Sequence, residues 1–311
     1  MESAVYVGID VSKDRLDVHV RPSGEHFVVA SDDKMLSRLA ERLRGLEPRL
    51  IVLEATGGLQ VKAAGLLAAA GLPVAVVNPR QVRDFAKSSG RLAKTDRLDA
   101  AAIAHFAEAI KPEPRPLPDE AQRGLAALVE RRRELVALRV AERNRRSQIQ
   151  SSWVRKDIEA SLADLAVRIE AVDAEIESHV KASPIWRSQE NLLKTVPGVG
   201  DVVARSLIAE LPELGTLSRR KIAALVGLAP YANDSGQFSG KRSIRGGRMA
   251  IRTVLYMAAV TASRCNPAIA AMYKRLRAAG KKPKVALTAC MRKLLVMLNA
   301  IARDQKPWQT A

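Results

Sequence analysis

Cysteine is scarce in this chain of 311 residues, which contains only Cys265 and Cys290. Neither belongs to a CxxC motif or a Cys/His cluster, so the sequence indicates neither a disulfide framework nor a zinc site. We expect both thiols to be buried apolar side chains. The chain also lacks a run of about 18 uninterrupted apolar residues, and its first residues read as a strand without the features of a signal peptide. We therefore expect a soluble, cytoplasmic protein with no membrane partner.

Acidic residues are almost missing from the last quarter of the chain. Residues 240–311 carry 16 basic residues against one acid, Asp304, so 15 of the 18 net positive charges lie there. Basic residues grouped in this way neutralise phosphates and release counterions, which favours a nucleic acid as partner. A basic surface kept for solubility, or one that faces anionic lipid, is the alternative.

The first 118 residues alternate strand-like and helix-like patterns. The runs VYVGIDVS, LDVHVR and HFVVA predict an antiparallel meander, and LIVLEA and PVAVVN predict two further strands. Helices are expected from Met35 to Leu43, from Leu59 to Ala70 and from about Thr95 to Ile110. The segment PEPRPLP then breaks regular structure. This order predicts an α/β domain over residues 1–118.

Residues 119–184 are dense in Arg, Glu and Ala and predict helix throughout. A heptad seam is formed by Ile158, Leu162, Leu165, Ile169, Val172 and Ile176, and a similar seam begins with Leu125, Leu128, Leu135 and Leu138. We predict an antiparallel coiled-coil hairpin joined near residues 150–157. A spacer or dimerisation arm is its simplest role. Direct nucleic-acid contact stays open because of Arg131, Arg132, Arg133, Arg143, Arg145 and Arg146.

Four carboxylates are candidates for a metal site. Asp10 and Glu54 end predicted strands, and the functional crevice of an open α/β sheet lies beyond the carboxyl ends of its strands. Asp96 and Asp99 are three residues apart at the start of a helix, which puts both on one face. Clustered carboxylates repel one another unless a divalent cation holds them, and oxygen ligands favour Mg²⁺ or Mn²⁺. Taken singly, each acid could equally be a turn former or a helix-terminus residue.

A glycine-rich basic stretch begins near Ser235. Its members are Gly240, Lys241, Arg242, Arg245, Gly246, Gly247 and Arg248, and Arg252 follows. Glycines let a phosphate approach the backbone, and guanidinium groups neutralise its charge. A serine hydroxyl needs a base or a metal for activation. No histidine follows His179, so a metal held by the other domain is the remaining obvious activator, although Ser235 could also simply form a turn.

Residues 185–311 predict a mostly α-helical domain with two further nucleic-acid motifs. Residues 192–211 resemble a helix-hairpin-helix in which Gly198 and Gly200 belong to the hairpin, and such a helix N-terminus binds a DNA phosphate through its N–H groups. An ordinary packing corner is the alternative. Lys281 and Lys282 belong to a basic segment around Gly280 that predicts a surface along a nucleic-acid strand, with a solvated face as the alternative.

Four long motifs occur in order along essentially the whole chain: GIDVSKDRLDV, VLEATGG, NPRQVRDFAKSSGRLAKTDRLDA and SGQFSGKRSIRGGRMAIRTVLYMAA. Together they resemble the Asp-Glu-Asp-Asp transposases of the insertion sequence 110 type. The resemblance implies a RuvC-like, ribonuclease-H-type fold for the N-terminal domain, with the four carboxylates above as metal ligands. It also implies that Ser235 is required for strand exchange and forms a covalent 5′-phosphoserine link, while Ser239 and Ser243 do not match by motif position.

By the same resemblance, the chain is expected to be a bacterial, nucleoid-associated DNA transposase or recombinase that acts as a homo-oligomer, a dimer or a tetramer. Its expected partners are donor and target DNA and a structured noncoding guide RNA, the bridge RNA. Because the metal ligands and the serine lie on separate domains, we expect a composite site, with assembly between protomers through the coiled coil as one way to form it. From the residues alone two alternatives remain: a metal-only Holliday-junction-type endonuclease, and a noncatalytic nucleic-acid-binding protein.

Overall fold

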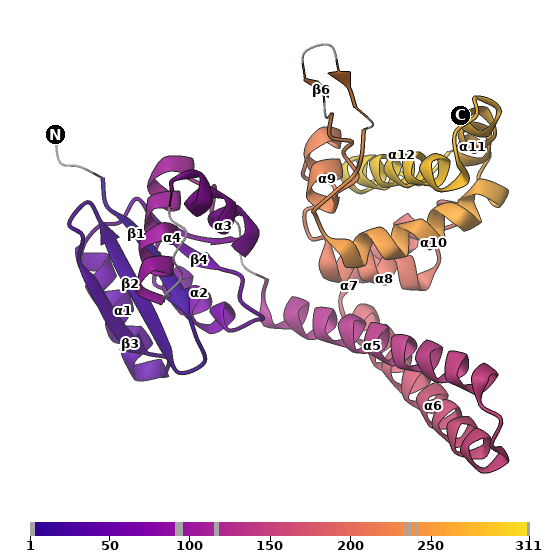
Figure 1. The fold of residues 1–311 in the computed structure, drawn as a ribbon, viewed down its shortest axis with the longest axis horizontal. Coiled ribbons are helices and arrows are strands. Elements are labelled where there is room, and N and C mark those ends of the chain that lie inside the picture. The colour runs from indigo at the N-terminus through magenta and orange to yellow at the C-terminus, as the bar shows by residue number, and fades with distance from the viewer. Residues whose placement is uncertain are drawn as a thin grey trace. The chain divides into compact units, whose positions relative to one another are not determined.

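A computed structural model describes residues 4–90, 96–114, 118–232, 234–235, 238–240 and 242–309, and for residues 96–97 and 238–239 it describes the backbone alone. The chain divides into two compact units, Met1–Pro118 and Asp119–Ala311. The first contains a sheet with helices, and the second is helical apart from a short β-ribbon (Figure 1).

The first unit is built on a five-stranded mixed sheet. Its strands are β1 Tyr6–Val11, β2 Arg15–Arg21, β3 His26–Ala30, β4 Leu50–Glu54 and β5 Val74–Val77. Their spatial order is β3-β2-β1-β4-β5, with antiparallel pairing among β1, β2 and β3 and parallel pairing among β1, β4 and β5. Short turns can join only antiparallel strands, so the meander comes first and the parallel strands follow helical crossovers. The predicted α/β class and antiparallel front are confirmed.

Four helices pack on this sheet: α1 Asp33–Gly45, α2 Gln60–Ala69, α3 Pro79–Ser88 and α4 Asp96–Ile110. Alternate residues of β1 face two different cores. Val7 and Ile9 pack with residues of α1 and α2, whereas Tyr6 packs with residues of α3 and α4. The sheet is therefore the middle layer of three, because successive side chains of a strand point to opposite faces.

Helix α3 does not follow from the hydrophobic pattern used above. Its N-cap is Asn78, whose side chain accepts a hydrogen bond from the Arg80 backbone N–H at 2.9 Å, and Pro79 occupies the first turn. An Asn-Pro pair is a start signal for a helix, so capping chemistry could have identified it.

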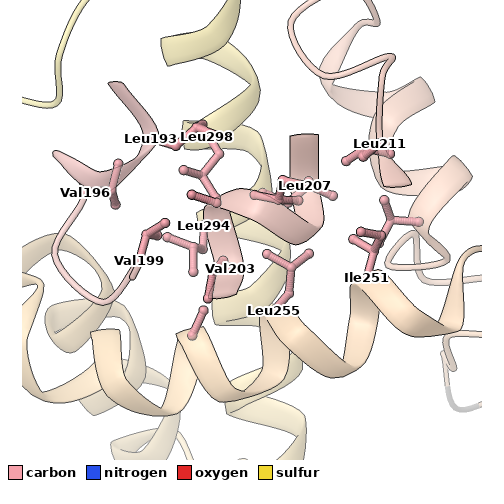
Figure 2. Close-up of a cluster of buried hydrophobic side chains, with 14 of the residues drawn as sticks. Leu193, Val196, Val199, Val203, Leu207, Leu211, Ile251, Leu255, Leu294 and Leu298 are labelled. Atoms are coloured by element: carbon pink, nitrogen blue, oxygen red, sulfur yellow. The ribbon is translucent and has the colours of Figure 1, made fainter. Parts of the chain in front are cut away.

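The second unit contains α5 Glu120–Gln148, α6 Ser152–Ala182, α7 Pro184–Lys194, α8 Asp201–Glu210, α9 Arg219–Val226, α10 Met249–Cys265, α11 Pro267–Ala278 and α12 Pro283–Asp304. The ribbon strands β6 Asp234–Ser235 and β7 Phe238–Ser239 lie between α9 and α10 in the sequence. The core gathers around α8, α10 and α12, where Leu207, Leu255 and Leu294 are fully buried (Figure 2). Each such leucine contributes about 2 kcal/mol by burial.

Helix α12 has the length and composition of a membrane-crossing helix, but 50% of its apolar window is buried inside the unit. Its apolar face is thus used in packing. The two cysteines differ in environment. Cys290 of α12 is buried, and this burial raises the pKa of its thiol, whereas Cys265 at the end of α10 is exposed. The expectation of burial is therefore confirmed for Cys290 and wrong for Cys265.

Helices α5 and α6 form an antiparallel hairpin that turns at residues 149–151, at the start of the predicted joint. The short connection makes the helices antiparallel, and ion pairs between Arg132 and Asp173, at 2.5 Å, and between Arg146 and Glu159, at 3.9 Å, link them. Leu135, Leu165 and Ile169 pack together between the helices.

The predicted seam is wrong at one position of the hairpin. Leu138 is 51% exposed, whereas Arg139, four residues after the buried Leu135, is partly buried.

The base of the hairpin shares a core with the helices that follow. Leu125 and Val129 of α5, and Ile176 and Val180 of α6, belong to the same buried cluster as residues of α8, α10 and α12. Ser183 and Pro184 therefore end α6 and begin α7 without separating two cores.

Candidate active site

Asp10 and Glu54 lie side by side at the carboxyl ends of two parallel strands. Ile9 of β1 pairs with Leu53 of β4, so the next residues occupy neighbouring positions. Both carboxylates fall on the face where Tyr6 and Val52 pack against α3 and α4, because every second residue shares a face. Each is partly buried.

Helix α4 crosses β1 at a glycine. A Cβ atom added to Gly8 would lie 2.2 Å from the backbone nitrogen of Ala104 and 2.4 Å from the carbonyl oxygen of Ala100. Only glycine allows the helix backbone to approach the strand this closely. Asp99 immediately precedes Ala100, and Asp10 follows Gly8 by two residues on the same face. The crossing therefore carries both acids on backbone segments that are fixed against each other.

The structure places three of the four predicted metal ligands at this end of the sheet. Asp99 is partly buried on the first turns of α4, one helical turn before the buried Ile103. Asp96 is the first residue of α4, and its side chain lies outside the described residues. Among the side chains that the structure describes, no group of three or more His, Cys, Asp or Glu could hold a metal ion as it stands.

Asp17 is a buried carboxylate on the same face, and the sequence pattern above gives it no role. It pairs with Asp10 in the antiparallel register of β1 and β2 and is 5% exposed. Arg15 and His26 each contact it at 3.3 Å. The alternation of β2 could have identified it, since Leu16 and Val18 face the opposite core. Asp17 thus adds negative charge beside Asp10, and Arg15 offsets it.

Ser235 lies on an exposed β-ribbon. It belongs to β6 and pairs with Phe238 of β7, and its own side chain is exposed. The Gly240 backbone N–H donates to Asp234 Oδ1 at 3.1 Å, and Tyr231 and Ser243 form a further bridge below the strands. Figure 1 shows this ribbon extending away from the helices of its unit. The serine is accordingly accessible to a large substrate.

Two glycines and two arginines fix the base of the ribbon. A Cβ atom on Gly247, which has a φ of +68°, would lie 2.3 Å from the backbone nitrogen of Gly227. Arg252 Nη1 donates to the carbonyls of Val226 and Gly246. Arg248 makes two hydrogen bonds to the Glu213 carboxylate, at 2.5 and 2.6 Å, and one to the Glu210 carbonyl. Both guanidinium groups are therefore engaged within the unit.

Other basic residues of this stretch face solvent. Arg242 and Arg245 are exposed, and the Arg245 guanidinium lies 5.3 Å from the ring centroid of Tyr231. Lys241 lies outside the described residues. Lys281 and Lys282 are exposed between α11 and α12, where Gly280 has a φ of +75°.

The predicted hairpin PGVG forms the turn between α7 and α8. Gly198 has a φ of +97°, and a Cβ atom there would lie 2.7 Å from the Cβ of Ala262 on α10. The buried Asn266 donates to the Pro197 carbonyl at 3.4 Å. Gly200 is exposed and is the N-cap of α8. Gly198 therefore fixes the turn against α10, while Gly200 presents the helix N-terminus to solvent.

An open groove of about 660 Å³ lies beside this turn. Its walls come from the hairpin base, α8 and α10, and they are mainly apolar, with Val136, Val202, Val254 and Met257 among them. Gly198 and Gly200 are the predicted binding residues that line it. Among the side chains that the structure describes, the predicted metal ligands and Ser235 do not line this groove.

Two family models match the chain. Residues 7–150 match a model described as a transposase, DEDD_Tnp_IS110, and residues 190–274 match the transposase IS116/IS110/IS902 family. The first match contains all four carboxylates, and the second contains Ser235 and the glycine-rich stretch. Together they reach both units.

Relatives share these regions at low identity. The pilin gene-inverting protein of Moraxella bovis is 26% identical over an alignment 316 positions long, which covers 98% of each chain. The insertion element IS110 uncharacterized 43.6 kDa protein of Streptomyces coelicolor is 29% identical over 148 residues, 47% of this chain and 35% of that protein. Among solved structures, T. thermophilus RuvC in complex with a Holliday junction substrate matches 37% of this chain and 100% of its own, with 22% identity and a TM-score of 0.28.

Proposed function

Because this chain belongs to the IS110 family of transposases, we propose that it cuts and rejoins DNA strands with Ser235 as the attacking group. Asp10, Glu54, Asp96 and Asp99 hold the divalent cation, Mg²⁺ or Mn²⁺. The observation that carries this proposal is the neighbouring placement of Asp10 and Glu54 on β1 and β4, below a helix that carries the two remaining acids.

The first unit fits a divalent cation by the chemistry of its donors. Asp10, Glu54 and Asp99 are partly buried carboxylates, and hard oxygen donors are the ligands that Mg²⁺ and Mn²⁺ prefer. Partial burial makes their mutual repulsion stronger than it would be in water, so a bound cation stabilises them. When bound, such an ion offsets the negative charge that develops on a phosphodiester during cleavage.

Ser235 supplies the covalent step. Its Oγ attacks a DNA phosphorus and forms a Ser–O–P bond, while the P–O3′ bond breaks and the departing 3′ oxygen gains the proton that the serine loses. A 3′ hydroxyl of the partner strand then attacks the same phosphorus, and Ser235 departs and recovers its proton. One P–O bond forms and one breaks in each step, so the energy of the phosphodiester is conserved. The exposed ribbon supports this role because a DNA backbone can reach it.

The basic residues of the second unit hold the nucleic acid. Arg242, Arg245, Lys281 and Lys282 are exposed and available to phosphates, and we assign Lys241 the same role. Arg248 and Arg252 act indirectly, since they fix the ribbon base. The α8 N-terminus at Gly198 and Gly200 contacts one further phosphate through its backbone N–H groups.

The metal ligands and the serine belong to different units, and they meet in a homo-oligomer, a dimer or a tetramer. Its substrates are donor and target DNA, and a structured guide RNA directs it to them at the bacterial nucleoid. The surplus of 15 positive charges over residues 240–311 supports a large polyanionic partner. The guide RNA rests on the family resemblance.

The test pairs two substitutions with matched controls. Ser235→Ala should abolish covalent protein–DNA adducts and retain DNA binding, while Ser243→Ala, also exposed on the ribbon, should retain both. Asp10→Asn should lose Mn²⁺ binding in titration calorimetry, while Asp14→Asn, an exposed acid four residues away, should keep it. Cleavage without an adduct in the unmodified protein would instead favour a metal-only nuclease, and absence of any metal-dependent cleavage would favour a noncatalytic binding protein.

Inversion of a DNA segment is a second candidate outcome of the same chemistry. The Moraxella bovis relative that matches 98% of this chain is named for gene inversion. A plasmid with two recognition sites in opposite orientation distinguishes the outcomes, since inversion changes the restriction pattern without loss of DNA.

A further inference from the structure

Trp153 has a solvent-exposed side chain, and packing within the protein does not explain this exposure. It lies at the start of α6, beside the turn of the hairpin, and it is 74% exposed. The other two tryptophans, Trp186 and Trp308, pack against the core of the second unit. A large aromatic side chain loses stabilisation when it is left in water, so an exposed indole is a feature of binding surfaces.

The part of the hairpin that contains Trp153 is rich in basic residues. We define the hairpin tip as residues 139–156, which contain six basic residues and one acid: Arg139, Arg143, Arg145, Arg146, Arg155, Lys156 and Glu142. The following residues of α6, 157–182, contain two basic residues and seven acids. The hairpin is thus positively charged at its tip and negatively charged along the rest of α6.

Few basic side chains of the tip form an ion pair among the residues that the structure describes. Arg145 pairs with Glu142 at 2.5 Å, and Arg146 pairs weakly with Glu159 at 3.9 Å. For Arg139, Arg143 and Lys156, the structure records no ion pair within the part of the chain that it describes. Cations without such a pair are available to phosphates.

A second copy of the chain is the competing occupant, and its acids are already engaged. Four of the seven acids over residues 157–182 form ion pairs with Arg or Lys of their own chain, namely Glu159, Asp164, Asp173 and Glu177, and Glu175 lies 3.4 Å from His179. These pairs leave little free negative charge for the tip of another protomer. A phosphate backbone has its full charge available.

We propose that the hairpin tip binds a single-stranded nucleic acid, with the Trp153 indole stacked on an unpaired base and with Arg143 and Lys156 on the flanking phosphates. Stacking on an aromatic ring requires an exposed base face, which a duplex does not offer within its length. The tip is therefore specific for unpaired segments, such as a loop of an RNA or a displaced DNA strand. This site rests on the proposed function for the class of its partner, and it uses none of the residues of the proposed catalytic site.

The experiment measures binding in the full chain that carries Ser235→Ala, so that catalysis does not contribute. Fluorescence anisotropy compares an unstructured RNA, an unstructured DNA and a duplex of the same sequence. Trp153→Ala should weaken single-strand binding about tenfold and leave duplex binding within twofold. Trp153→Phe should retain most of the affinity. Val167→Ala, another exposed apolar residue of the same hairpin, is the matched control and should change nothing.

The charged residues give an independent readout. Arg143→Gln with Lys156→Gln should reduce the slope of log K against log salt for single strands by about 1.4, because two phosphate contacts are lost. Unchanged single-strand affinity in a folded Trp153→Ala protein would overturn the proposal. So would a change of oligomeric state with unchanged affinity, which would make the tip a self-association surface. The adduct assay for Ser235 is unaffected by either result, so this inference and the proposed function can fail separately.

Discussion

In the first unit, Asp10 and Glu54 extend from strands that are hydrogen-bonded on both sides, whereas Ser235 in the second unit lies on a two-residue strand with a single partner. The acids are partly buried beneath α4, and the serine is exposed. A metal site needs ligand positions fixed within a few tenths of an ångström, while a nucleophile for DNA must be reached by a long and stiff substrate. On the proposed roles, each group is presented by the kind of backbone that its chemistry requires.

The largest loss of stability is expected at Gly8, where β1 and α4 are in close contact. Gly8→Ala would put a Cβ atom 2.2 Å from the backbone nitrogen of Ala104, and backbone cannot move aside as a flexible side chain can. We expect the first unit to lose about 3 kcal/mol of unfolding free energy. Urea unfolding followed by circular dichroism measures it, and tryptophan fluorescence separates the units because all three tryptophans lie in the second.

Gly65→Ala is the matched control for that substitution. Gly65 is inside α2 with open space around its Cβ position, so alanine should stabilise the first unit by about 0.5–1 kcal/mol. An equal unfolding free energy for the Gly8→Ala and unmodified proteins would show that α4 can shift on the sheet. The contrast between acids on a fixed backbone and a serine on an exposed ribbon would then fail.

A smaller effect is expected at the base of the ribbon. Arg248→Ala leaves the Glu213 carboxylate, 17% exposed, without its two hydrogen bonds, and should cost about 2 kcal/mol in the second unit. Arg242→Ala removes an exposed side chain and should weaken DNA binding with no change in stability. Thermal unfolding and DNA binding, measured on both variants, test whether the two arginines differ. Equal stability of the two variants would refute the assignment of Arg248 to the ribbon base.

The smallest effect concerns the turn between α7 and α8, a fixed region within the second unit. Lys194 donates a hydrogen bond to Asp201 and lowers the pKa of that carboxyl. A folded-state pKa below the unfolded one stabilises the protein above the unfolded pKa, and this contribution is lost as pH falls through the folded pKa. Asp201→Asn should therefore cost a few tenths of a kcal/mol at neutral pH, since the pair is about half exposed, and nothing in strong acid. A cost that persists in acid would exclude the ion pair as its cause.

Much of the first unit could be predicted from local pattern. The strands follow from runs of β-branched residues, and the meander follows from short polar turns, so the residue pattern alone places Asp10 and Glu54 at strand ends. Two features need signals other than these runs and turns. Helix α3 depends on its Asn-Pro start more than on periodicity, and the role of Asp17 depends on its neighbours Arg15 and His26 across two strands.

The roles of the arginines were harder to predict, because their partners are distant in sequence. Arg248 and Arg242 belong to the same basic stretch, and the sequence alone does not distinguish their roles. Glu213, which binds Arg248, is 35 residues away, and only the packing of the ribbon base brings the two together. Composition identifies a polyanion-binding region, but it does not identify which of its Arg and Lys side chains are already paired within the protein.

Two helices of the second unit begin with positive charge. Arg219 and Arg220 start α9 and Lys282 caps α12, and neither helix has an acid in its first turn. A helix N-terminus is itself partially positive, so at low ionic strength each such cation costs about 0.3–1 kcal/mol. Salt screens this repulsion, and the same salt weakens phosphate binding. The melting temperature of the free protein should therefore rise with salt concentration, whereas its affinity for nucleic acid should fall.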